Sequence, residues 1–97
     1  MKYEIIIPHS VYEELNEAAL YYESKQNDLG VKFLLDWELA MKLIKNTPLH
    51  YQKKLKEFRS IKLSNFPYLL IFEIEGKKII VYRLVNARMN PKRIFKK

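Results

Sequence analysis

The sequence predicts an α+β fold in which two helices pack as an antiparallel hairpin on one face of a small, twisted antiparallel sheet. Two observations predict it. The first half of the chain has two stretches with apolar residues at helical spacing, separated by a short turn. The second half has β-rich segments that close in a tight hairpin. With a short strand ahead of the helices, the predicted order is βααβββ, in one domain over residues 1–97.

The first strand is expected at residues 3–7, where isoleucines precede Pro8. A helix over residues 11–25 follows, because Ser10 and Glu13 have the spacing of a capping box. In that motif each side chain accepts a hydrogen bond from the backbone N–H of the other residue. The apolar residues of this helix recur at helical spacing: Val11, Leu15, Ala18 and Tyr22.

A turn at residues 26–30 joins the two helices. Gly30 is expected to adopt a positive φ there, and Asp28 to cap the next helix. The second helix is expected over residues 30–46 and ends before Pro48, because proline disfavours helical geometry in the preceding residue. Its broad apolar face predicts packing against both the sheet and the first helix. That face comprises Phe33, Leu35, Trp37, Leu39, Ala40, Met41, Leu43 and Ile44.

The second half begins with a polar connection and continues as strands. The connection, which could contain a short helix, spans residues 49–58, and strands are expected at residues 59–63, 68–74 and 78–85. In the last strand, alternation places Tyr82 with Ile80 and Leu84 on one face, and Arg83 with Val81 and Val85 on the other. We expect the face around Tyr82 to be core and Arg83 to lie on the more open face. Residues 87–97 are expected to form a basic tail.

Charge is distributed unevenly along the chain. Residues 1–50 carry a net charge of −3, whereas residues 51–97 carry +10 and contain all four arginines. A basic half implies a polyanionic partner, such as nucleic acid, a ribosome or an acidic protein segment. A solvated surface with excess lysine is the alternative interpretation.

Composition argues against several classes of protein. There is no cysteine, which excludes disulfides and thiolate metal sites. Two histidines without a spaced set of carboxylates predict no metal, and two glycines leave no phosphate-binding loop and no expected cofactor. No apolar run approaches the roughly 18 residues of a membrane helix, and no secretory signal is evident. We expect a cytoplasmic protein that does not contact a membrane.

Several motifs, taken together and in order, resemble the RelE/ParE superfamily of bacterial toxins over residues 3–93. The spacing is closer to the ParE, or plasmid stabilisation, branch, because the helical hairpin is long and the Phe-Pro-Tyr triplet is typical there. The residues that carry the resemblance are Tyr21 and Tyr22, Gly30-Val-Lys-Phe33, Pro48, Tyr51, Arg59, Phe66-Pro-Tyr68, and Arg88 with Pro91. Considered alone, the tyrosine pair is better explained by core and helix-interface packing, and the triplet by the entry into the central strand.

The resemblance implies the toxin of a type II toxin–antitoxin system, which inhibits growth by one of two mechanisms. RelE-like members are ribosome-dependent mRNA endoribonucleases, and other members poison DNA gyrase. In a ribonuclease, Arg59, Arg83 and Arg88 are the candidates for stabilising the phosphate, because a guanidinium can bind two phosphate oxygens. The acid and base are harder to identify. Asn86 stands where many ribonuclease members have His, and an amide cannot transfer a proton.

The remaining candidates for proton transfer are weak. His9 and His50 lie outside the matched motifs, Glu57 is expected to be a solvated loop carboxylate, and Tyr82 is expected to face the core. Since the groups for charge stabilisation are present and those for proton transfer are missing, we favour a protein that is not itself an enzyme and that binds gyrase. A ribosome-dependent nuclease and a degenerate member that only binds its antitoxin stay open.

All three hypotheses imply a cognate antitoxin and a toxin–antitoxin hetero-oligomer. By family resemblance, an extended or helical antitoxin segment covers the sheet and the helical hairpin, and an acidic segment would complement the basic half. The residues expected to bind the target or the antitoxin are Arg59, Asn86, Arg88, Lys92 and Arg93.

Overall fold

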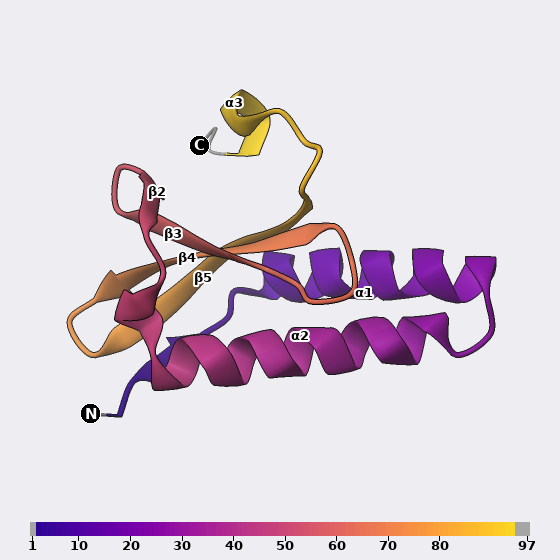
Figure 1. Ribbon diagram of the computed structural model, residues 1–97, viewed down its shortest axis with the longest axis horizontal. Coiled ribbons are helices and arrows are strands. Elements are labelled where there is room, and N and C mark those ends of the chain that lie inside the picture. Colours follow the sequence, from indigo (N-terminus) through magenta and orange to yellow (C-terminus); the bar gives the residue numbers. More distant parts are fainter. Residues whose placement is uncertain (1, 95–97) are drawn as a thin grey trace.

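The computed structural model has two helices on one face of a five-stranded sheet and a short C-terminal helix on the other (Figure 1). It describes residues 2–94, apart from the side chains of Leu55, Pro91 and Lys92. The elements are β1 (Glu4–Ile6), α1 (His9–Lys25), α2 (Leu29–Asn46), the 3-10 helix η1 (Pro48–His50), β2 (Lys53–Leu55), β3 (Phe58–Lys62), β4 (Tyr68–Glu75), β5 (Lys78–Asn86) and α3 (Pro91–Ile94).

The sheet has the strand order β1-β5-β4-β3-β2. The α+β class and the helical hairpin on one face are confirmed, but the sheet is mixed, because β1 pairs in parallel with the first residues of β5. The polar connection contains the 3-10 helix η1, consistent with the short helix that the sequence allowed there, and the strand β2, which was not predicted. Part of the expected tail forms α3, which was not predicted either. The last three residues of that tail, 95–97, lie outside the described residues.

The main core lies between the helical hairpin and the sheet. Phe33 of α2 and Phe72 of β4 are both fully buried in it. The predicted face of α2 is too broad, however: Leu35, Leu39 and Leu43 are 59%, 46% and 40% exposed. The helix thus presents more apolar surface than the described residues cover. The buried residues of the hairpin are Val11, Leu15, Ala18 and Ala19 of α1, and Phe33, Trp37, Ala40 and Ile44 of α2.

The predicted cap of α1 was wrong, whereas Asp28 is the N-cap residue of α2, as predicted, although its side chain makes no capping hydrogen bond. The capping residue of α1 is Pro8, and Ser10 lies inside the helix, so no capping box forms. At the start of α2 the positive φ belongs to Asp28, at 69°, and Gly30 is helical. The Glu23 carboxylate accepts hydrogen bonds from the backbone N–H groups of Asp28 and Gly30, both at 3.0 Å. A side chain from α1 therefore satisfies the orphan amides of α2.

A β-bulge in β5 overturns the predicted faces of that strand. Val81 lies opposite Phe72 and Arg83 opposite Ile71, so Tyr82 is an extra residue between the two pairs. Val81 is fully buried against the helices. Tyr82 packs with a second apolar cluster on the other face, which comprises Phe58, Ile71, Val85 and Ile94 of α3. The simple alternation of a strand fails here because the extra residue shifts its phase.

The close contact of α1 with α2 at Gly30 provides a test of the hairpin geometry. A Cβ atom on Gly30 would lie 2.7 Å from the carbonyl oxygen of Ala19. Forcing the helices apart costs about 1–3 kcal/mol, more than the roughly 1 kcal/mol that Ala gains over Gly in a helix. We expect Gly30→Ala to unfold at lower urea than the wild type.

A matched control is Asn16→Ala, an exposed position of α1 that is expected to keep wild-type stability. Equal or greater stability of Gly30→Ala would contradict this helix packing.

Candidate functional site

Arg83 is engaged by two other elements of the chain. It donates to one oxygen of the Glu14 carboxylate, from Nη2 at 2.8 Å and from Nε at 3.1 Å. Its Nη1 donates at 3.3 Å to the carbonyl of Arg93 in α3. The side chains of Arg83 and Glu14 are 29% and 24% exposed. The predicted open position of Arg83 is thus replaced by a partly buried ion pair that joins β5, α1 and α3.

The other oxygen of Glu14 protects the edge of the sheet. It accepts a hydrogen bond of 2.9 Å from the backbone N–H of Leu84. In the described part of the chain, β1 pairs with β5 only from Lys78 to Ile80, so Leu84 lies beyond the end of that partner strand. A side-chain carboxylate here accepts the hydrogen bond that a neighbouring strand would otherwise accept.

Arg59 lies in β3 and has an internal partner of its own. Its Nη1 donates a hydrogen bond of 2.6 Å to the carbonyl of Tyr51, just after η1. This contact joins the connection after α2 to the sheet. A guanidinium held in this way is less free to bind a phosphate than an unpaired one.

The structure separates Arg59 from Asn86 and Arg88. Arg59 pairs with Phe72, whereas Asn86 pairs with Tyr68 at the far end of β4. Four residues of strand correspond to about 13 Å. Arg88 follows two residues after Asn86. The sheet therefore does not bring Arg59 and Arg88 together as a compact phosphate site.

Asn86 ends β5 and organises the turn after it. Its Oδ1 accepts a hydrogen bond of 2.9 Å from the backbone N–H of Arg88, and its side chain also hydrogen-bonds the Tyr68 hydroxyl. Arg88 itself is exposed. Asn86 thus holds Tyr68 and the backbone of Arg88 in place, while the guanidinium of Arg88 faces solvent.

Three tyrosine hydroxyls gather where α1 meets this end of the sheet. Burial raises the pKa of Tyr68 above its ordinary value, with smaller contributions from Tyr22 and Tyr21, and the hydrogen bond from Asn86 lowers it. Burial also raises the pKa of Tyr22, and the charge of nearby Arg88 acts in the opposite direction. Raised pKa values keep both hydroxyls protonated at neutral pH and make them poor bases.

Proton transfer has no well-placed candidate among the groups predicted from the sequence. The hydrogen bond and charge of Lys53 lower the pKa of Glu57, which makes this carboxylate a weaker base. His9 is 89% exposed, 3.7 Å from Glu13. His50 is also exposed, with its ring against Tyr51. Tyr82 packs on Phe58, with ring centroids 4.6 Å apart.

The C-terminal candidates are only partly described. Arg93 is exposed, and its backbone holds Arg83. The side chain of Lys92 lies outside the described residues. Among residues 2–94, no group of three or more His, Cys, Asp or Glu side chains could hold a metal ion. None of the described helices is long and apolar enough to cross a membrane.

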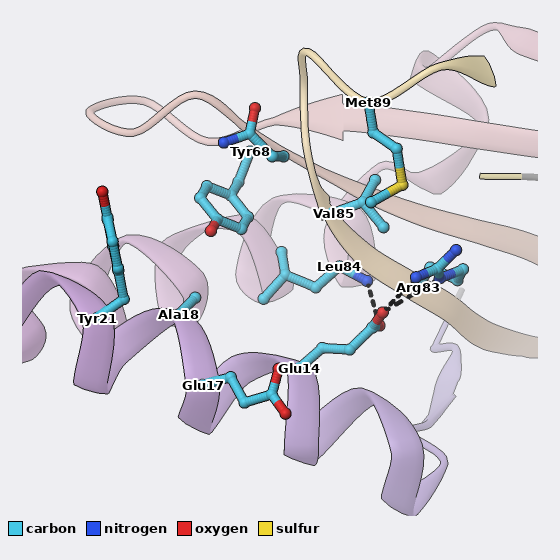
Figure 2. Close-up of a pocket in the computed structure, with 10 residues that line it drawn as sticks. Glu14, Glu17, Ala18, Tyr21, Tyr68, Arg83, Leu84, Val85 and Met89 are labelled. Atoms are coloured by element: carbon cyan, nitrogen blue, oxygen red, sulfur yellow. Dashed lines mark hydrogen bonds and ion pairs between the residues drawn. The ribbon is translucent and has the colours of Figure 1, made fainter. Parts of the chain in front are cut away.

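A groove of about 370 Å³ lies between α1 and the outer edge of β5 (Figure 2). Its α1 side is formed by Glu14, Glu17 and Tyr21, and its sheet side includes Tyr68 and Arg83. The sequence analysis missed Glu14 and this groove. The available signal was the spacing of Glu14, Glu17, Ala18 and Tyr21, which places the four residues on one face of a helix.

Comparison with known proteins defines the class of protein. A model of the family described as ParE toxin of type II toxin-antitoxin system, parDE, matches residues 5–91. The chain belongs to this family and, with it, to the RelE/ParE superfamily. No curated protein sequence matches the chain.

The fold has a counterpart among solved structures. A chain from the structure titled "Chromosomal ParDE TA system from P. aeruginosa" superposes with a TM-score of 0.78 and 15% identity. The match covers 88% of this chain and 96% of that one. At this identity, the similarity supports the fold alone.

The triple contact of Glu14 can be tested by removing its carboxylate. Glu14→Ala leaves Arg83 and the Leu84 amide without their acceptor, which costs about 1–3 kcal/mol for a buried donor. We expect lower stability in urea and faster hydrogen exchange at Leu84. Glu13→Ala, one residue away and outside this contact, should change stability by less than about 0.5 kcal/mol. Equal stability of the two variants would show that Glu14 does not stabilise the edge of β5.

Proposed function

We propose that this ParE-type toxin inhibits growth by binding and poisoning DNA gyrase, and that a cognate antitoxin neutralises it. The proposal rests on the contacts that two of the four arginines make inside the fold. Arg83 is paired with Glu14, and Arg59 is bonded to the Tyr51 carbonyl. Only Arg88 and Arg93, of the four arginines, are classed as exposed. Exposed cations suit contact with a large partner.

A ribonuclease would need cations that converge on one phosphate, together with an acid and a base. The fold holds Arg59 far along the sheet from Arg88. It also gives Glu57 a lowered pKa and engages Asn86 in the turn. These features support action by binding, with Arg88, Arg93 and Lys92 as contact residues and Asn86 as the residue that positions Arg88.

The exposed face of α2 supports neutralisation by a protein partner. Apolar residues four positions apart form a stripe along this helix, which the rest of the described chain leaves exposed. An antitoxin segment that covers the stripe would bury apolar surface, and acidic residues in it would complement the basic second half. We place the resulting hetero-oligomer in the cytoplasm. The stripe consists of Val31, Leu35, Leu39 and Leu43.

The proposal predicts an effect of Arg88 on gyrase. Purified toxin should inhibit supercoiling by gyrase and accumulate cleaved DNA, and added antitoxin should restore supercoiling. Because Arg88 is exposed, Arg88→Ala should keep the fold and require about tenfold more protein for the same inhibition, equivalent to about 1.4 kcal/mol of lost binding. Lys62→Ala, an exposed strand lysine, is the matched control.

Unchanged supercoiling and unchanged DNA cleavage at concentrations that arrest growth would contradict gyrase as the target. A folded protein that causes no growth defect on induction would instead indicate a degenerate member that only binds its antitoxin.

A further inference from the structure

The groove beside α1 is lined by carboxylates and tyrosine rings. The proposed binding of gyrase does not account for these groups. Its α1 wall places Glu14, Glu17, Ala18 and Tyr21 on one helical face, in that order along the axis. Glu14 is already paired with Arg83. Glu17, one turn further along, is exposed, and no hydrogen bond or ion pair joins it to any of the described side chains. In Figure 2 the dashed contacts of Arg83 and Leu84 go to Glu14, and none goes to Glu17.

Aromatic rings form the other end of the groove. Tyr21 is 54% exposed and stands upright from α1, with Tyr68 facing it across the groove (Figure 2). The Tyr21 and Tyr22 rings meet at nearly a right angle, with centroids 5.2 Å apart and planes at 80°. Asn86 fixes Tyr68 through its hydroxyl. The two rings are therefore held in place before any ligand arrives.

The Tyr21 ring already attracts a cation from its own chain. The ammonium of Lys25 lies 5.1 Å from the ring centroid. Tyr21 lines the groove, whereas Lys25 does not. Ala18, between Glu17 and Tyr21, carries only a methyl group and leaves space for a flat group.

We propose that this groove binds an arginine side chain presented by a partner protein. A guanidinium is planar, stacks on an aromatic face and donates several hydrogen bonds to a carboxylate at once. Tyr21 supplies the face and Glu17 the carboxylate. In the neighbouring ion pair, the carboxylate of Glu14 binds the guanidinium of Arg83 within the chain itself. The inference goes beyond the gyrase proposal and does not depend on which target the toxin acts on.

Charge favours a protein partner over nucleic acid at this groove. Glu14 and Glu17 both line it, and the positive charge of Arg83 is balanced by Glu14. A phosphate would meet the unpaired Glu17 carboxylate, whereas a guanidinium is attracted to it. The groove is thus an acidic site in a protein whose net charge is +7.

The test is an NMR titration of the ¹⁵N-labelled protein with N-acetyl-arginine methylamide. We expect saturable shifts confined to Ala18, Tyr21 and residues 84–86, with a dissociation constant on the order of millimolar. N-acetyl-lysine methylamide should bind about fivefold more weakly, because an ammonium cannot stack or bind in a bidentate manner.

Variants with matched controls locate the site. Glu17→Gln and Tyr21→Leu should each weaken arginine binding about fivefold or more, because each removes one of the two interactions. Glu13→Gln and Tyr12→Leu, a carboxylate and a ring on α1 outside the groove, should bind as the wild type does. The spectra of the free variants report directly that all four are folded.

Three results would overturn the proposal. They are the absence of saturable shifts with the arginine probe, equal binding of the lysine probe, and saturation of the same residues by guanosine monophosphate in preference to arginine. The last would identify a nucleotide site. None of these outcomes bears on gyrase inhibition, so failure here and failure of the proposed function can be told apart.

Discussion

The β-bulge at Tyr82 is the constraint on which the functional end of the molecule depends. Because it inserts one residue into β5, Val81 and Leu84 both face the helical hairpin, while Val85 packs with Ile94 on the opposite face. The sheet is thereby buried on both faces. The bulge also directs Arg83 to the outer edge of β5, beyond the end of β1, where it can reach Glu14 of α1 and the carbonyl of Arg93. The bulge in β5 therefore places Arg83 where its side chain joins β5 to α1 and α3.

The same arrangement decides which side chains are available for function. The fold engages Arg83 in a partly buried pair and Arg59 in a backbone contact, and it uses Asn86 to hold Tyr68 and the turn of Arg88. Groups that resemble a ribonuclease site in the sequence therefore act largely as structural contacts. The groups that face solvent include Arg88, Arg93 and the exposed leucines of α2. They suit contact with large partners, which supports the proposal that this toxin acts by binding.

Local pattern was enough to predict the helices and the long strands, because the buried residues of α2 recur at helical spacing and β4 is a continuous run of apolar residues between turns. It could not predict the bulge, since a phase shift depends on pairing with Ile71 and Phe72 and not on local pattern. Nor could it separate Leu39 from Ala40, because both are apolar and only the packing leaves Leu39 46% exposed. The contacts that define the groove join residues 14 and 83, too far apart in sequence for any local signal. The site was therefore less predictable than the fold.

The measurement that tests the central claim most directly is mapping of mRNA ends by primer extension in a reconstituted translation reaction that contains the purified toxin. If the arginines serve structure and contact, as their partners indicate, the mRNA stays intact at toxin concentrations that arrest growth. New 5′ ends inside the reading frame that require ribosomes would contradict this account. They would show that Arg88 and its neighbours take part in cleavage, with the acid and base supplied from outside this chain.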